Sequence, residues 1–185
     1  FSGGVLKERE ELAKKLRQLA AQGVFLGTSS WKYPGWFGTI YDRERYVWRK
    51  RFSQARFERD CLAEFALTFP SVSLDASYYK FFDERALQEL AAQVPEHFQF
   101  GFKVCHDITL KRFPQIPRFG QRAGAANPHF LDATLFADAF LAPCEAIHRH
   151  VGLIMFEFSH FGLGEFERGA QFVDALENFF AKLPR

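Results

Sequence analysis

Hydrophobic and polar positions follow two different periods along the chain. Four apolar runs have the length of buried strands, and between and after them apolar residues recur at the three- to four-residue spacing of helices that face a core. The predicted strands cover residues 24–28, 71–76, 98–104 and 152–158, and the predicted helices cover residues 53–68, 84–93, 130–146 and 167–182. Four strand–helix units in succession predict an α/β fold with a parallel sheet.

Two further segments lie outside this alternation. Leucines spaced among Lys, Arg and Glu predict an amphipathic helix over about residues 7–21 that packs against the main domain. Residues 111–128 contain four basic residues and three prolines, which predicts a long irregular loop after the third strand. We therefore separate an N-terminal helix, residues 1–22, from a main domain, residues 23–185.

The alternation of side chains within the strands predicts an apolar face and a polar face. In the third strand Phe98, Phe100, Phe102 and Val104 share one face, and Gln99, Gly101, Lys103 and Cys105 share the other. The second strand sets Val72, Leu74 and Ala76 against Ser73, Asp75 and Ser77, and the fourth sets Ile154, Phe156 and Phe158 against Leu153, Met155, Glu157 and Ser159. If the apolar face meets the helices, Lys103, Asp75 and Glu157 converge near the carboxyl ends of their strands.

A lysine between two carboxylates is either a structural ion-pair network or a functional site. Ligands and catalytic groups collect at the carboxyl ends of parallel strands, which favours function. We take Lys103, Asp75 and Glu157 as candidate catalytic residues. The lysine can act as a base, a Schiff-base nucleophile or an anion clamp, and the carboxylates as general acid or base; the sequence leaves these roles open.

The stretch GTSSWKYPGW, residues 27–36, follows the first predicted strand. Aromatic rings beside small hydroxyls suit stacking on a sugar or base, with hydrogen bonds at its edge. Ser29, Trp31, Tyr33 and Trp36 are therefore candidate ligand-binding residues at the rim of a pocket. The alternative is that the two tryptophans belong to the core.

Three stretches resemble the signatures of the YecE-like family, also called domain of unknown function 72 (DUF72). They are GTSSWKYPGWFGTIY, SLDASYYKFF and FQFGFKVCHDIT. The resemblance implies a TIM-type (β/α) barrel, and the family has no assigned activity. It also implies site positions at Gly27, Thr28, Ser29, Trp31, Tyr33, Trp36, Tyr78, Tyr79, Lys103 and Thr109, and Ser77 is added as a ligand-binding candidate in the polar stretch.

The chain departs from the family pattern at the chemically active positions. Asp75 stands where Glu is usual, Ala76 and Ser77 where Asn is common, Leu110 where His is usual, and Glu157 where Gln is typical. These changes alter proton chemistry more than shape, so we carry no activity over from the family to this chain.

The number of strand–helix units matches half of a barrel. Eight units normally need about 250 residues, and this chain supplies four. An open half-barrel leaves a sheet edge and an apolar face uncovered. We expect a main domain that is incomplete at its C-terminus, and the alternative is that two copies pair as a homo-oligomer.

Composition and residue spacing limit the compartment, the cofactors and the partners that we expect. Three cysteines without a C-x-x-C pair, and no signal-peptide pattern, predict a cytoplasmic protein with neither disulfides nor a cysteine zinc site. No apolar run is long enough to span a membrane. His106, Asp107 and His160, with Glu157 or Asp75, follow no standard metal-binding spacing, so we predict no metal, and the cofactor stays unknown.

Two functions remain open, and with them the question of whether the protein is an enzyme. The first is binding or conversion of a small polar or anionic ligand, sugar-like or phosphate-like, at the strand ends. The second is a non-catalytic nucleic-acid or polyanion-binding module that uses the basic and aromatic segment Arg43 to Arg59, which otherwise forms a solvated helix face. Basic residues in the loop 111–128 either clamp an anion or keep the loop soluble. The formal net charge of +2 does not choose between these functions.

Overall fold

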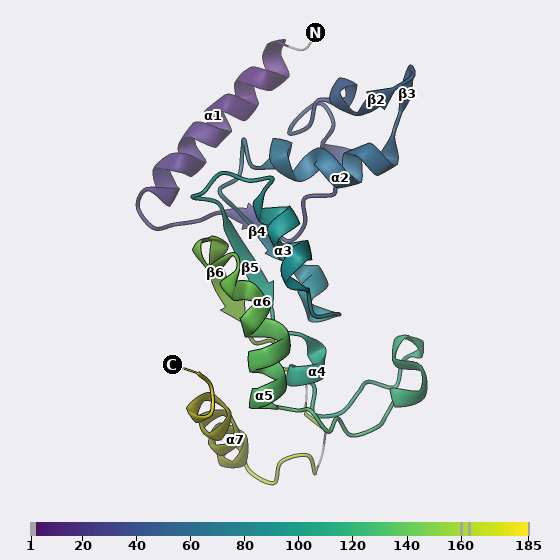
Figure 1. Cartoon of the computed structure of the whole chain (residues 1–185), viewed down its shortest axis with the longest axis vertical. Helices are drawn as coiled ribbons and strands as arrows, with labels where there is room; N and C mark the ends of the chain where they lie inside the picture. The colour runs from purple at the N-terminus through teal and green to yellow at the C-terminus, as the bar shows by residue number, and fades with distance from the viewer. Residues whose placement is uncertain (1–2, 160, 163, 185) are drawn as a thin grey trace.

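The structure is a computed structural model that describes residues 3–159, 161–162 and 164–184. Its centre is a four-stranded parallel sheet in the order β1-β4-β5-β6 (Figure 1). The strands are β1 (Gly27–Thr28), β4 (Ser71–Leu74), β5 (Gln99–Lys103) and β6 (Val151–Met155). The predicted parallel α/β fold is confirmed, and among the described residues the sheet does not close into a barrel.

All the predicted helices are present, and the structure adds the short α4 (His106–Thr109), which the periodicity did not predict. The predicted helices include α1 (Gly3–Ala20), α2 (Gln54–Phe65), α3 (Glu84–Ala91) and α7 (Gly169–Ala181). The predicted helix over 130–146 is one helical stretch with a π-helical turn: α5 (Ala133–Phe136), Ala137–Leu141 and α6 (Ala142–Glu145). Ser53, Asp83 and Asp132 each accept a hydrogen bond from a first-turn N–H of the helix that follows, which fixes the start of α2, α3 and α5.

The core lies between one face of the sheet and the helices. Phe98, Phe100, Phe102 and Val104 are all buried, as are Val72 and Leu74 on the neighbouring strand. Aromatic residues from α2 and from the α5–α6 stretch pack against this face. The predicted apolar face of the sheet is therefore confirmed.

Strand parity fails just beyond two strand ends. The chain turns into a 3-10 helix at Asp75–Tyr78 directly after β4, so Ala76 is exposed and Ser77 is buried, the reverse of the prediction. Cys105 is likewise buried, because β5 ends at Lys103 and Cys105 begins the turn into α4. Alternation across a strand holds only while the backbone stays extended.

The first strand is shorter than predicted. Val24, Phe25 and Leu26 precede β1 and are exposed, and only Gly27 and Thr28 pair with β4. The carbonyl of Pro70, the residue before β4, accepts a hydrogen bond from the Gln99 N–H of β5, and the Val24 N–H donates to the Leu19 carbonyl of α1, so neither group extends the ladder between β1 and β4.

The opposite face of the sheet is open in the described structure. It carries the small residues Ser71, Ser73 and Gly101, and on β6 the exposed Leu153 and Met155. No described helix is long and apolar enough to cross a membrane.

The segment from Arg43 to Arg59 is not one helix face, which corrects that part of the sequence interpretation. It begins with a 3-10 turn at Arg43–Tyr46, continues through an antiparallel hairpin of β2 (Val47–Trp48) and β3 (Arg51–Phe52), and only then enters α2. Arg49 and Lys50 form the tip of the hairpin with φ angles of 49° and 64°. The sequence lacks the Asn-Gly or Asp-Gly pair that usually signals such a turn, so the hairpin was missed.

Candidate functional site at the strand ends

Lys103 links two carboxylates at the carboxyl end of the sheet. Its Nζ lies 3.0 Å from Glu157 Oε2 and 3.7 Å from Asp75 Oδ1. The Ser73 hydroxyl donates a 3.1 Å hydrogen bond to the same Asp75 oxygen. The predicted convergence of these three charges is therefore observed, because Lys103 is the last residue of β5 and Asp75 directly follows the adjacent β4.

The two carboxylates stabilise the charged form of the lysine. The hydrogen bond to Glu157 raises the pKa of Lys103, and the charge of Asp75 raises it further. Lys103 is therefore an ammonium at neutral pH. A lysine that acts as a general base or Schiff-base nucleophile needs a lowered pKa, so this geometry favours a fixed cation.

This group of charges is accessible. The side chains of Lys103, Asp75 and Glu157 are 29%, 41% and 53% exposed. One ammonium against two carboxylates gives the group a formal charge of −1. Unlike a buried pair, these groups keep lone pairs and N–H bonds that can turn toward a ligand.

Lys103 and Asp75 border a cavity of about 450 Å³ on the open face of the sheet. Its walls combine small and polar residues with apolar ones. Besides Asp75 and Lys103 they include Thr28, Ser29, Ser71, Ser73, Gln99, Gly101 and Gly152, and the apolar residues Phe25, Val72 and Leu153. Gly101 and the serines take up little space on this face, which leaves the hollow below the ammonium group. Hydroxyl and amide groups of this kind can both donate and accept hydrogen bonds.

The predicted aromatic platform does not line this cavity. Trp36 packs against the core on the helix side and stacks on Phe65 with ring centroids 6.3 Å apart. Trp31 also contacts the core, and its carbonyl accepts a hydrogen bond from Tyr41. Tyr33 is exposed and its ring is tilted against Trp36. Of the four candidates in residues 27–36, only Ser29 is brought to the cavity.

Of the remaining candidates, Ser77, Thr109 and Tyr78 are buried or partly buried, and Tyr79 is exposed. The Ser77 hydroxyl lies 2.6 Å from the carbonyls of Leu74 and Lys103, so it fastens the chain ends of β4 and β5 together. Thr109 is fully buried, and its hydroxyl has no hydrogen-bond partner among the described residues. Tyr78 is partly buried beside the charges: burial raises its pKa, and Glu157 adds to the effect.

His106 joins this end of the sheet to the loop 111–128. Its buried ring lies edge-on to Tyr78 and Tyr79, with centroids 5.6 and 6.3 Å away, and also contacts Phe113 and Phe119 of the loop. Burial lowers the pKa of His106 despite the adjacent Asp107. The sequence marked His106 only as a possible metal ligand, because nothing local shows that Phe113 and Phe119 fold back onto it.

The basic residues of the loop already have partners within the chain. The Arg122 guanidinium donates to Asp107 at 2.8 Å, and Arg118 stacks over the Tyr79 ring at 4.1 Å from its centroid. Arg112 is 3.4 Å from Glu165, and Lys111 donates to the Glu165 carbonyl. These contacts favour an ordered loop over an anion clamp.

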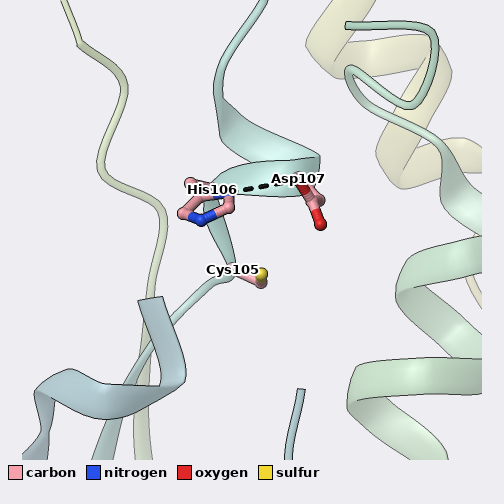
Figure 2. A group of neighbouring side chains, drawn as sticks. All are labelled: Cys105, His106 and Asp107. Atoms are coloured by element: carbon pink, nitrogen blue, oxygen red, sulfur yellow. Dashed lines mark hydrogen bonds and ion pairs between the residues drawn. The ribbon is translucent and has the colours of Figure 1, made fainter. Parts of the chain in front are cut away.

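Cys105, His106 and Asp107 bring metal-ligating atom types within 4.8 Å of one another (Figure 2). Burial raises the pKa of the Cys105 thiol to about 11, so the thiolate that a metal needs is disfavoured. The Asp107 carboxylate already accepts hydrogen bonds from His106 Nδ1 and Arg122. Figure 2 shows the imidazole and the thiol extending in different directions, so the group suits a hydrogen-bonding role. His160, the other histidine considered for a metal, lies outside the described residues.

Comparisons with known proteins give the family. A family described as "Protein of unknown function DUF72" matches residues 25–185. Two crystal structures of a DUF72 family protein from Enterococcus faecalis are similar to this chain, with 21% and 24% sequence identity over 79% and 69% of it and a TM-score of 0.43 in both cases. The chain spans 46% of the length of each of these solved chains. No curated protein matches.

Proposed function

The chain belongs to the DUF72 family, and from that premise and the geometry at the strand ends we propose that it binds a small polar, sugar-like molecule beside Lys103. The observation that carries the proposal is the accessible Lys103 ammonium between Asp75 and Glu157, above a hollow with hydroxyl-bearing walls. The proposal includes a barrel to which this chain contributes four βα units over residues 23–185. It is supported by the parallel order β1-β4-β5-β6 and by helices on one face.

The charge balance favours a neutral ligand over a phosphate. Asp75 and Glu157 outnumber Lys103, so a phosphate at the ammonium group meets two carboxylates within the same few ångströms. A sugar hydroxyl can donate to a carboxylate and accept from the ammonium at the same time. Thr28, Ser29 and Ser73 line the same cavity and add further partners for hydroxyl groups.

In a reaction at this site the lysine and the two carboxylates have different roles. Lys103 holds a permanent positive charge and orients both carboxylates, and Asp75 and Glu157 are the groups that exchange protons with a bound hydroxyl. Tyr78 and Tyr79 border this group on the side of His106. The proposal is that the ligand binds, whether or not a reaction follows. A reaction requires in addition that one carboxylate reaches an ionisable hydrogen of the substrate.

The test is a calorimetric titration of the purified protein with a panel of neutral monosaccharides, and with glucose 6-phosphate and inorganic phosphate as anionic probes. We expect heat from at least one neutral sugar and none from the two anions. Lys103→Met should abolish that heat, and Lys182→Met, at an exposed lysine at the end of α7, should leave it unchanged. Binding of phosphate in place of sugars, or sugar binding that survives Lys103→Met, would contradict the proposal.

A further inference from the structure

The hairpin β2–β3 presents an isolated tryptophan to solvent. Val47 pairs with Phe52 and Trp48 pairs with Arg51, so each pair lies on one face of the hairpin. Phe52 faces the core, where its ring lies edge-on to Phe37. Trp48 and Arg51 therefore share the outer face, and Trp48 is 62% exposed. Its large ring contributes little to the core from this position.

Basic residues neighbour this tryptophan in the hairpin. Arg49 and Lys50 follow Trp48 at the tip, Arg51 is its cross-strand partner, and the Arg49 guanidinium carbon lies 5.9 Å from the Trp48 ring centroid. All three basic residues are exposed, and none of them forms a salt bridge within the described part of the chain. By contrast Arg59, on the neighbouring α2, is paired with Asp60 at 2.7 Å.

The backbone at the tip is strained. Arg49 and Lys50 both have positive φ, a conformation that costs little for Gly or Asn and more for residues with long side chains. Stability alone favours Asn-Gly at these two positions. Strain of this kind is typical of functional sites, and here it places two unpaired cations beside an exposed ring.

We propose that the hairpin Val47–Phe52 is a contact site for single-stranded nucleic acid, separate from the small-molecule site at Lys103. A base stacks on Trp48, and Arg49, Lys50 and Arg51 contact the phosphates on either side of it. Aromatic rings within a basic surface are the recurring means of binding single strands without sequence preference. A membrane surface usually engages a broader apolar face, whereas here one ring stands among charged neighbours. Figure 1 shows the hairpin at one end of the molecule, where a strand can reach it.

The test is fluorescence anisotropy with a labelled oligothymidylate of about 12 nucleotides, a length within the usual site size. Trp48→Leu should weaken binding by about 5-fold to 150-fold, the range for loss of one stacked base, and should leave the salt dependence unchanged. The double variant Arg49→Asn/Lys50→Gly should weaken binding and reduce the slope of log affinity against log salt by about 1.4, because two phosphate contacts are lost.

The double variant also separates function from folding. Asn and Gly adopt positive φ with less strain than Arg and Lys do. The melting temperature of the double variant should therefore equal or exceed that of the wild type, while its affinity for the oligonucleotide falls. Arg59→Gln removes an arginine that is also exposed but already paired, and it should change neither the melting temperature nor the affinity by much. Oligonucleotide binding that is equal in the wild type and both hairpin variants would overturn the proposal. So would Trp48-dependent binding to phosphatidylserine vesicles with no oligonucleotide binding, which would assign the hairpin to a membrane surface.

Discussion

Two ion clusters in this molecule, one around Glu64 and one around Lys103, have opposite surroundings. Glu64 on α2 is 1% exposed, and its carboxylate accepts hydrogen bonds from Arg9 at 3.0 Å, the Asp42 N–H at 3.0 Å and the Tyr46 hydroxyl at 2.8 Å. The cluster around Lys103 borders an open cavity, and each of its side chains is at least 29% exposed.

The difference shows which cluster serves the fold. The Glu64 carboxylate is sealed and has partners on both oxygens, so no lone pair points to a ligand. It ties α1, which lies outside the matched family region, to α2 and to the segment around Tyr46. The Lys103 cluster has unused hydrogen-bonding capacity and access to solvent. Burial and the completeness of hydrogen bonding distinguish the two better than residue types do.

The largest expected effect tests the structural cluster. Glu64→Ala should lower the free energy of unfolding by about 3–5 kcal/mol, because it leaves Arg9 and Tyr46 without their buried partner. Urea denaturation measures this change. The control is Glu58→Ala on the exposed side of the same helix, which should cost less than about 0.5 kcal/mol. If the two variants lose equal stability, the contrast between a sealed and an open cluster is wrong.

A smaller effect is expected from the cation of the same cluster. Arg9→Met should cost about 1.5–3 kcal/mol, the range for a hydrogen bond to a charged group, since Glu64 retains Tyr46 and the Asp42 N–H. Limited proteolysis should then cut within α1 earlier than in the wild type. An unchanged cleavage rate together with unchanged stability would show that α1 does not depend on this contact.

The open cluster should contribute little to stability. Lys103→Met should change the free energy of unfolding by less than about 1 kcal/mol, because an accessible ion pair is screened by solvent. Urea denaturation beside the binding titration makes the comparison direct: ligand binding is lost and the fold is retained. A loss of stability as large as that of Glu64→Ala would make Lys103 a structural residue.

The smallest effect is the pH dependence of this contribution. The pKa of Lys103 is raised in the folded state, so its stabilising contribution is fully present below the unfolded pKa of about 10.4 and is lost as the pH rises through the folded value. The stability difference between the wild type and Lys103→Met should therefore shrink above about pH 10.4. A difference that grows in this range would contradict the assigned direction.

Much of the sheet was predictable because strand periodicity is a local property. The alternation of Phe98, Phe100 and Phe102 with Gln99, Gly101 and Lys103 indicated both the buried face and the position of the lysine. Adjacent parallel strands then required Asp75 to lie near Lys103. The predictions were wrong where the chain leaves the extended conformation, at Ala76, Ser77 and Cys105, because parity has no meaning in a turn.

Other features depended on contacts between distant segments. From the sequence, Trp31, Tyr33 and Trp36 have two interpretations, as pocket rim or as core, and the packing of Trp36 on Phe65 and Phe69 favours the core for that residue. The hairpin at Arg49 and Lys50 was not predictable, since its turn uses residues that local preference disfavours. Nor did the spacing of Phe113 and Phe119 indicate that the loop closes on His106.

The sequence by itself determined the parallel α/β fold, the alternation of the main strands and helices along the chain and the meeting of three charges at the strand ends. These follow from hydrophobic period and strand alternation, which act over a few residues. Only the tertiary structure decided that Glu64 is sealed, that Lys103 is open and that Trp48 faces solvent. Burial is a property of everything that surrounds a side chain, and most of those neighbours are far away in the sequence.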